Sequence, residues 1–219
     1  MSLLKIKMPG WNEPKLVKYT GKHIYEFNAD NFNIETLTDG SAQWSIYSQA
    51  AVPTLTKIVD GLSIHFATTS TACQLNLALD QFNLTKPFGV EFSATPDARD
   101  FIYLGPNYAS LTIGRNNWFN NIGLWIYSPS DYTLYKGSYN YTYYDYIRFA
   151  GISFTLPVHF KEVVDPSTGH IEMYIDGEIC FAGNIPTSAI SNGVITFNNG
   201  GAEAIGANVN LHSLQIYYV

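Results

Sequence analysis

The chain has 219 residues, of which 46% are hydrophobic and 14% charged, and its net charge is −6 at pH 7. This proportion of apolar residues can bury a large core, which excludes an intrinsically disordered chain. No run of about 18 apolar residues occurs, which excludes a membrane-spanning helix. The length fits one β-sandwich domain.

The chain begins with a basic segment that precedes an acidic body. Residues 1–22 contain five lysines and one acidic residue, so they carry +4, and the rest of the chain carries −10. We therefore predict a basic N-terminal arm over residues 1–22 and one folded domain over residues 23–219. A solvated terminus and an arm that docks on an acidic neighbour, such as a second copy of the body, both fit this charge pattern.

The same N-terminal segment bears on localisation and partners. It reads MSLLKIKMPGW and lacks the apolar stretch and the small-residue cleavage site of a secretory leader, so we expect synthesis in the cytoplasm without a signal peptide. We expect no nucleic-acid partner, because the acidic body would repel phosphate.

Alternating apolar and polar residues predict short antiparallel strands along most of the remaining chain. The clearest segments are 62–66, 88–94, 111–114, 121–127, 170–176 and 193–197. Asp176-Gly177 follows one of them and predicts a tight hairpin, because a type I′ turn needs two residues with positive φ. We find about fourteen candidate strands and, apart from one short turn at 186–191, no helix. These features predict an all-β fold, a two-sheet antiparallel β-sandwich of jelly-roll type.

Three segments of the second half occur in an order that resembles a known superfamily. They run from His159 to Val164, from Tyr174 to Gly177 (Y-I-D-G) and from Leu211 to Tyr217. The order is similar to that of the concanavalin A-like lectin/glucanase superfamily, in particular its laminin G-like members as found in phage virion proteins. The resemblance implies a concanavalin A-like jelly roll. It leaves function open, because this fold occurs in lectins, hydrolases, receptors and virion parts.

The acidic residues do not form the catalytic pattern of the glucanase branch. That branch carries carboxylates on one strand in a pattern like E-x-D-x-x-E, which places them in one cleft. Here the nearest cluster is Glu172, Asp176 and Glu178, and Asp176 is explained by the turn that Gly177 closes. There is no G-x-S-x-G nucleophile motif and no H-x-x-x-H metal motif. We therefore expect no enzyme and no catalytic residues.

Metal and disulfide patterns are equally sparse. The candidate calcium ligands are Asp97 with Asp100 and, separately, Asp30, but neither group has a defined ligand spacing. We predict turn-capping roles for them and no metal or cofactor, with calcium as the alternative. Cys73 and Cys180 lie in apolar, strand-like runs without C-x-x-C spacing. We interpret them as buried thiols and leave open whether they pair with each other.

Two segments have the composition of a binding surface. Residues 114–121 (GRNNWFNN) combine an aromatic side chain with hydrogen-bonding groups, as carbohydrate sites do, although a polar turn with one packed Trp also fits. Residues 132–146 hold seven tyrosines, which fit a packed sheet edge, a protein interface or a glycan-stacking surface. We predict six ligand-binding residues from these segments: Arg115, Asn117, Trp118, Tyr139, Tyr141 and Tyr143.

These observations favour a non-catalytic module of a larger assembly. We expect a virion structural or adhesion component, such as a phage tail, fibre or capsid-decorating protein, that lies at the virion surface. Its expected partners are other subunits or itself, and a host-surface glycan, with no insertion into a membrane. The alternative is a free-standing carbohydrate-binding lectin, followed by a glycoside hydrolase.

Overall fold

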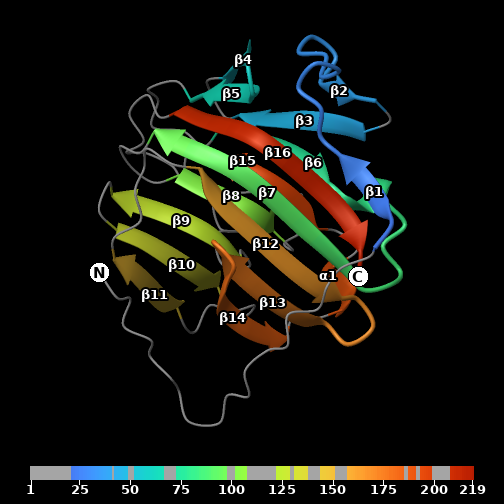
Figure 1. The fold of residues 1–219 in the computed structure, drawn as a ribbon, viewed down its shortest axis with the longest axis vertical. Helices are drawn as coiled ribbons and strands as arrows, with labels where there is room; N and C mark the ends of the chain where they lie inside the picture. Colours follow the sequence, from blue (N-terminus) through green and yellow to red (C-terminus); the bar gives the residue numbers. More distant parts are fainter. Residues whose placement is uncertain are drawn as a thin grey trace.

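The computed structural model shows two antiparallel β-sheets stacked face to face (Figure 1). It describes residues 21–40, 42–48, 52–66, 73–97, 102–107, 122–128, 131–137, 144–150, 157–184, 187–190, 193–198 and 208–219. The predicted all-β sandwich of jelly-roll type is confirmed. Among the described residues, no helix is both long enough and apolar enough to cross a membrane.

The first sheet has the strand order β14-β13-β12-β7-β16-β5-β4, and β1 also pairs with β16. Its strands are β1 (His23–Glu26), β4 (Thr54–Ile58), β5 (Gly61–His65), β7 (Phe88–Asp97), β12 (Val158–Asp165), β13 (His170–Ile175), β14 (Glu178–Asn184) and β16 (Asn208–Tyr218). The two strands nearest the ends of the described chain, β1 and β16, therefore lie side by side.

The second sheet has the strand order β11-β10-β9-β8-β15-β6-β3-β2. Its strands are β2 (Thr38–Asp39), β3 (Ala42–Ser48), β6 (Cys73–Ala78), β8 (Ile102–Asn107), β9 (Ile122–Ser128), β10 (Asp131–Gly137), β11 (Tyr144–Ala150) and β15 (Val194–Asn198). A 3₁₀ turn, η1 (Leu79–Gln81), and one helical turn, α1 (Thr187–Ile190), complete the described elements, and α1 falls where the sequence predicted a short turn.

The core lies between the sheets because each strand points alternate residues inward. In β13, Ile171, Met173 and Ile175 are buried, whereas His170 is exposed on the opposite face, as the alternation predicted. In β7 the ring of Phe92 stacks on Phe160 at 4.8 Å within the first sheet and meets Phe197 of the second sheet at 5.7 Å. Burying such large rings supplies much of the free energy that holds the sheets together.

A chain of buried hydrogen bonds connects strands of the two sheets. The Nε1–H of Trp44 donates to the hydroxyl of Tyr25 at 3.2 Å, and that hydroxyl donates to Oδ2 of Asp39 at 2.8 Å. The backbone N–H of Asn28 donates to the same carboxylate oxygen at 2.9 Å. Burial, with the Asp39 charge adding to it, raises the pKa of Tyr25 well above its ordinary value. The chain joins β1, β2 and β3, and each member depends on the next for its partner.

The side-chain amide of Gln81 continues the backbone hydrogen bonding of β3 past the end of its partner strand β6. The backbone N–H of Gln43 donates to Oε1 of Gln81 at 2.7 Å, and Nε2 of Gln81 donates back to the carbonyl of Gln43 at 2.7 Å. Gln81 thus satisfies both backbone groups of Gln43 where β6 has turned away into η1.

The predicted hairpin at Asp176-Gly177 is confirmed, with φ of 50° and 81°. Oδ1 of Asp176 accepts the backbone N–H of His159 at 3.0 Å, so this carboxylate fixes the start of β12. The predicted strand segment 170–176 is one residue too long: β13 ends at Ile175, and Asp176 lies in the turn, as the sequence analysis interpreted it. Its positive φ is the reason, because that conformation breaks the alternation.

A bulge in β16 is tied to the β4–β5 turn. The register of β16 against β7 shifts between Leu211 and Ser213, around His212. Nδ1 of His212 lies 3.1 Å from the carbonyl of Asp60, and its Nε2 lies 2.8 Å from Oγ1 of Thr95. Because a carbonyl can only accept, Nδ1 donates to Asp60. A Cβ at Gly61 would lie 2.0 Å from the Leu211 carbonyl oxygen, so the turn needs glycine there.

The Trp44–Tyr25–Asp39 chain generates a stability prediction. Tyr25→Phe removes the hydroxyl that is hydrogen-bonded to the indole N–H of Trp44 and to the carboxylate of Asp39. Each of these buried groups then lacks one partner, which costs about 1–3 kcal/mol of folding free energy per group. We expect the free energy of unfolding, measured by urea titration, to fall by about 3 kcal/mol. Tyr218→Phe is the matched control, because its hydroxyl donates to the carbonyl of Asn83 at an exposed site. Equal losses in the two variants would contradict the chain's role.

Cys73 generates a prediction about thiol reactivity. It is buried in β6, as predicted, and burial raises the pKa of its thiol to about 11. Cys180 lies in β14, and its side chain is outside the described part of the structure. In a Cys180→Ser variant at pH 8, we expect Cys73 to react with iodoacetamide about a hundredfold more slowly than a small thiol.

The pH profile provides the check on this prediction. Because the raised pKa keeps the group protonated, the labelling rate of the native variant should climb steadily up to about pH 11, and unfolded protein should label rapidly at pH 8. A rate in the native protein that levels off near pH 9 would contradict the raised pKa.

Candidate functional site

The outward face of the second sheet carries a group of buried polar side chains. In β6, Leu75 and Leu77 point into the core, so Gln74 and Asn76 point outward. In β15, Phe197 points into the core and Thr196 outward. We call Gln74, Asn76 and Thr196 the polar group. Their exposed fractions are 7%, 2% and 2%, although they lie on the side of the sheet away from the core.

Two atoms of the polar group lack a hydrogen-bond partner. They are Oδ1 of Asn76 and Oγ1 of Thr196, which belong to residues directly paired across β6 and β15. The amide of Asn76 uses its nitrogen, which donates to Oε1 of Gln74 at 3.5 Å. A buried polar atom without a partner costs about 1–3 kcal/mol, so folded proteins leave few of them. Two on neighbouring residues are therefore an unusual feature of this face of the sheet.

The register of the second sheet aligns the polar group with aromatic positions of the neighbouring strands. One row of directly paired residues crosses six strands of the sheet. In order, its members are Gln74, Asn198, Tyr103, Trp125, Thr133 and Arg148. In the backbone register, this row joins Gln74 on β6 to Tyr103 on β8, Trp125 on β9 and Arg148 on β11. Carbohydrate sites combine these residue types, because aromatic rings cover the apolar side of a sugar and polar groups bind its hydroxyls.

The six ligand-binding residues predicted from the sequence lie outside the described residues. They are Arg115, Asn117, Trp118, Tyr139, Tyr141 and Tyr143. The flanks of the tyrosine stretch are described, and they form a hairpin in which Tyr135 pairs with Tyr146 and Gly137 with Tyr144. Its second strand, β11, is the edge strand of the second sheet.

The sequence analysis missed the polar group. Its strand pattern was visible, because Gln74 and Asn76 alternate with leucines in CQLNLA and Thr196 precedes Phe197 in VITFN. Alternation alone places these residues on an outward face, where water normally satisfies them. Their burial is a tertiary property, and no signal in the sequence indicated it.

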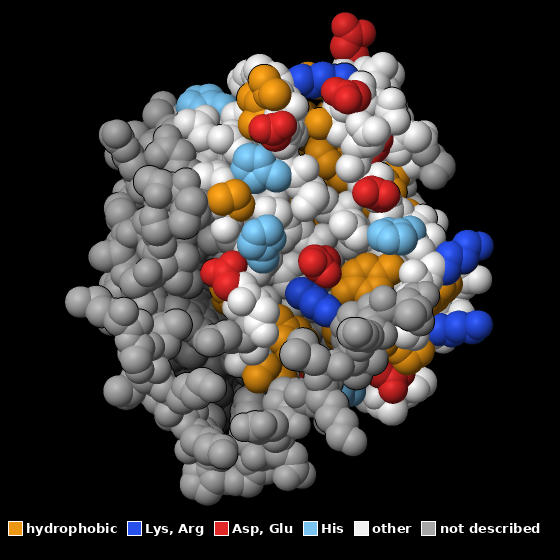
Figure 2. All heavy atoms as spheres, in the orientation of Figure 1, with side chains coloured by type: hydrophobic (Ala, Val, Ile, Leu, Met, Phe, Trp, Pro, Cys, Tyr) orange, Lys and Arg blue, Asp and Glu red, His pale blue; other side chains and the backbone are white. Residues whose placement is uncertain are grey.

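The outward face of the first sheet carries a second group, which is charged. A row of Cα partners crosses three strands from Glu91 in β7 to Lys161 in β12 and Tyr174 in β13. We define the carboxylate–tyrosine patch as Glu91, Lys161, Glu172, Tyr174 and Tyr217. Figure 2 shows this face of the molecule, with histidine side chains spread over it and acidic and basic side chains together near its centre.

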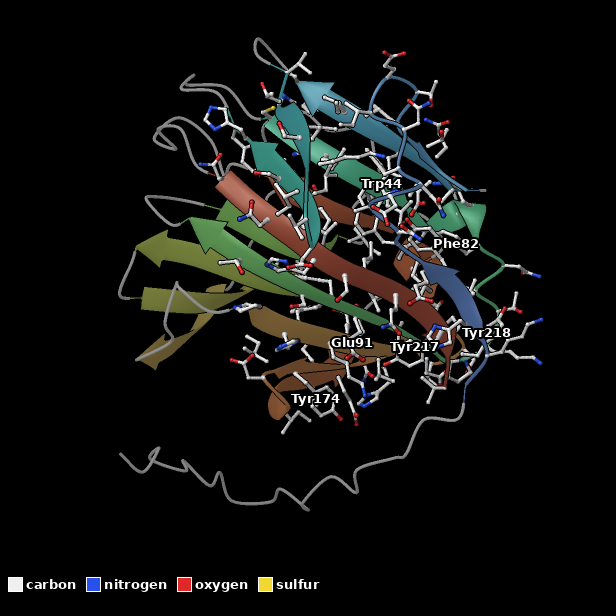
Figure 3. The ribbon with its side chains drawn as sticks, turned by 45° about the horizontal axis from the view of Figure 1, so that its top comes forward. Trp44, Phe82, Glu91, Tyr174, Tyr217 and Tyr218 are labelled. Atoms are coloured by element: carbon white, nitrogen blue, oxygen red, sulfur yellow. The ribbon has the colours of Figure 1, made fainter. Side chains whose placement is uncertain are left out.

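Hydrogen bonds and ring contacts hold this patch in place. The hydroxyl of Tyr174 donates to Oε2 of Glu172 at 2.6 Å, and the hydroxyl of Tyr217 donates to Oε2 of Glu91 at 3.4 Å. Nζ of Lys161 lies 5.7 Å from the centre of the Tyr174 ring, within the range of a cation–π contact. Figure 3 shows Glu91 and Tyr217 side by side on this face, with Tyr174 further along it.

The patch is partly shielded from water. Burial lowers the pKa of Lys161, and the nearby Glu91 charge opposes that effect. The ring of Tyr217 lies across Gly89 of the neighbouring strand: a Cβ at Gly89 would be 2.5 Å from Cζ of the ring. Only 6% of Tyr217 is exposed. Because Gly89 has no side chain, it leaves a space in which the Tyr217 ring lies, and we call this space the Gly89 slot.

The described carboxylates of the outward faces mostly have structural partners. Glu172 binds Tyr174 and lies 3.5 Å from Nε2 of His170, and Asp176 holds the start of β12. Asp30 is exposed in a turn whose backbone N–H groups bind Asn28, while Asp97 is described only as part of β7, and Asp100 lies outside the described residues. Within the part of the chain that the structure describes, no three His, Cys, Asp or Glu residues are grouped to hold a metal ion.

The chain matches no protein-family model and no curated protein sequence. Solved structures do match its fold. The laminarinase catalytic domain of Thermotoga maritima MSB8 is 11% identical with a TM-score of 0.63, over 91% of this chain and 98% of that one. The carbohydrate recognition domain of Emp46p is 11% identical with a TM-score of 0.57, over 92% and 100%. The fold is concanavalin A-like.

Longer proteins contain a similar sandwich as one part. A sialidase is 12% identical with a TM-score of 0.57, over 80% of this chain but 17% of its own length. The binding domain of botulinum neurotoxin DC, solved in complex with SialylT, is 14% identical with a TM-score of 0.51, over 87% of this chain and 48% of that one. The chain thus spans less than half of these proteins. The concanavalin A-like neighbours include enzymes and binding domains, and at these identities they establish the fold alone.

The Gly89 slot generates a prediction. Gly89→Ala places a methyl group in the Tyr217 ring, so we expect a loss of about 1–3 kcal/mol in the free energy of unfolding, as for other overpacked sites. In the double variant Gly89→Ala/Tyr217→Ala the methyl group has room, and the added loss from Gly89→Ala should disappear. A double-mutant cycle measured by urea denaturation checks this coupling. Additive losses would contradict it.

Proposed function

We propose that this chain is a non-catalytic carbohydrate-binding module and that the polar group lies in its ligand surface. One observation carries the proposal: Oδ1 of Asn76 and Oγ1 of Thr196 are buried side by side without hydrogen-bond partners. Both residues are buried, so a ligand reaches these atoms only by displacing the groups that cover them. A sugar hydroxyl can then donate to the first atom and accept from the second, because a hydroxyl group does both. Satisfying both atoms would recover the free energy that their burial costs.

The surroundings of these atoms favour a sugar over a charged small molecule. Gln74, Asn76 and Thr196 are all uncharged, and the row that continues from Gln74 passes through Tyr103 and Trp125. Amide groups with aromatic residues beside them suit hydroxyls and the apolar side of a pyranose ring. The likeness to the carbohydrate recognition domain of Emp46p supports this proposal.

Two observations support a non-catalytic role over hydrolysis. The sequence has no E-x-D-x-x-E strand, and Glu172, from its nearest acidic cluster, is bound by Tyr174. The likeness to an endo-1,3-β-glucanase makes β-1,3-glucan the first substrate to exclude. Release of reducing sugar from β-1,3-glucan by purified protein, lost in Glu172→Gln, would overturn the non-catalytic role.

We further propose that the module serves adhesion in a larger assembly at a virion surface, where it contacts other subunits or itself and binds a host-surface glycan. The separation of a basic arm from an acidic body supports a subunit that assembles. Light scattering of the full chain beside a variant lacking residues 1–20 tests assembly. This deletion retains Lys22, whose carbonyl accepts the backbone N–H of Tyr218 at 3.2 Å. An unchanged solution mass would count against a role for the arm in self-assembly.

The polar group generates a prediction in which stability and binding respond differently. Thr196→Val keeps the shape and removes the hydroxyl, so the free energy of unfolding should stay unchanged or rise slightly. Retention on an array of neutral and acidic glycans should fall about tenfold, the equivalent of one lost hydrogen bond of about 1.4 kcal/mol. Asn76→Leu should lower retention further.

Thr56→Val is the matched control, because Thr56 is exposed on β4 of the first sheet. It should bind glycans as the unchanged protein does. If Thr196→Val binds as well as Thr56→Val, the polar group is not the ligand surface. If Thr196→Val also loses stability, the hydroxyl has a structural role, such as binding a buried water.

A further inference from the structure

We propose that residues 1–20, the basic arm, dock on the carboxylate–tyrosine patch of the same body. The described chain starts beside this patch. Gly21 lies against the carbonyl of Tyr218, the carbonyl of Lys22 accepts the Tyr218 N–H at 3.2 Å, and His23 pairs with Tyr217. The arm therefore joins the body at the strand that carries one of the patch tyrosines.

The charges of the arm and the patch are complementary. Residues 1–20 contain four lysines and one glutamate, so they carry +3. The patch has two carboxylates, Glu91 and Glu172, against one lysine. Glu26 adds a third carboxylate, because it pairs with Gln215, which in turn pairs with Glu91. A negative surface beside the point where a positive segment enters the fold attracts that segment at short range.

The patch residue nearest the arm's point of attachment, Tyr217, is almost fully buried. Tyr217 faces outward, one side of its ring lies on Gly89, and still only 6% of the residue is exposed. Lys161 is also partly shielded from water, because burial lowers the pKa of its ammonium group. The arm has suitable covering residues, including Trp11, Leu16 and Tyr19.

The arm is long enough to reach the whole patch. Twenty extended residues span about 66 Å. The distance from β16 to β13 is three strand spacings, about 14 Å. A segment attached at Gly21 also meets the patch of its own body at a high effective concentration, which favours docking within one chain.

Limited trypsin digestion of the full chain tests this docking. Trypsin can cut after Lys15 and Lys18 only when the arm leaves the surface. The test variant is Glu91→Gln/Glu172→Gln, which removes the two patch carboxylates. The control is Asp30→Asn/Glu35→Gln, which removes two exposed carboxylates away from the patch. Mass spectrometry gives the cutting rate at each lysine, and near-ultraviolet circular dichroism checks that all variants are folded.

We expect the cutting rate after Lys15 and Lys18 to rise about threefold to tenfold in the test variant, as for the loss of exposed ion pairs. The rate in the unchanged protein should rise similarly in 0.5 M salt, and the control should behave as the unchanged protein does. Equal rates in test and control variants would overturn the proposal. Protection that grows with protein concentration would overturn docking within one chain and indicate exchange of arms between copies.

Discussion

The pairing of β16 with β7 is the constraint on which the rest of the structure depends. Ten residue pairs join these strands, interrupted by a single bulge at His212. The pairing turns Leu214 and Phe92 toward the core and Gln215 and Glu91 away from it. On either side, β1 and β5 attach to β16, and β12 attaches to β7. A slip by one residue would exchange the core and surface faces of the whole first sheet, so its register is strongly determined.

The two outward faces of the sandwich are chemically different. On the first sheet the side chains are charged, and they engage one another: Tyr174 binds Glu172, and Tyr217 binds Glu91. On the second sheet the three side chains of the polar group are neutral, and two of their polar atoms remain unsatisfied. The first kind of surface suits a charged segment that must be held in a fixed position. The second suits a ligand that brings hydroxyl groups of its own.

The sequence predicted the features that depend on neighbouring residues. The alternation in β13 and the Asp176-Gly177 turn were read correctly, because strand period and positive φ are local properties. The row from Glu91 to Tyr174 joins residues more than eighty positions apart, so it could not be read before the register was known. The burial of Asn76 and Thr196 was missed for a related reason, because it depends on what covers the strand. The six predicted ligand residues remain a prediction, since they lie outside the described residues.

The adjacency of β1 and β16 has a consequence for how this domain can be connected to others. Gly21 lies against Tyr218, and the N–H of Val219 donates to the carbonyl of Pro87 at 2.9 Å, so both ends of the described body lie at one side of one sheet. A short peptide could join residue 219 to residue 21, and new ends could be opened in a surface turn such as Thr168-Gly169. The same geometry lets the sandwich be inserted as a unit into a loop of another protein, because a host loop needs only a small gap to accommodate it.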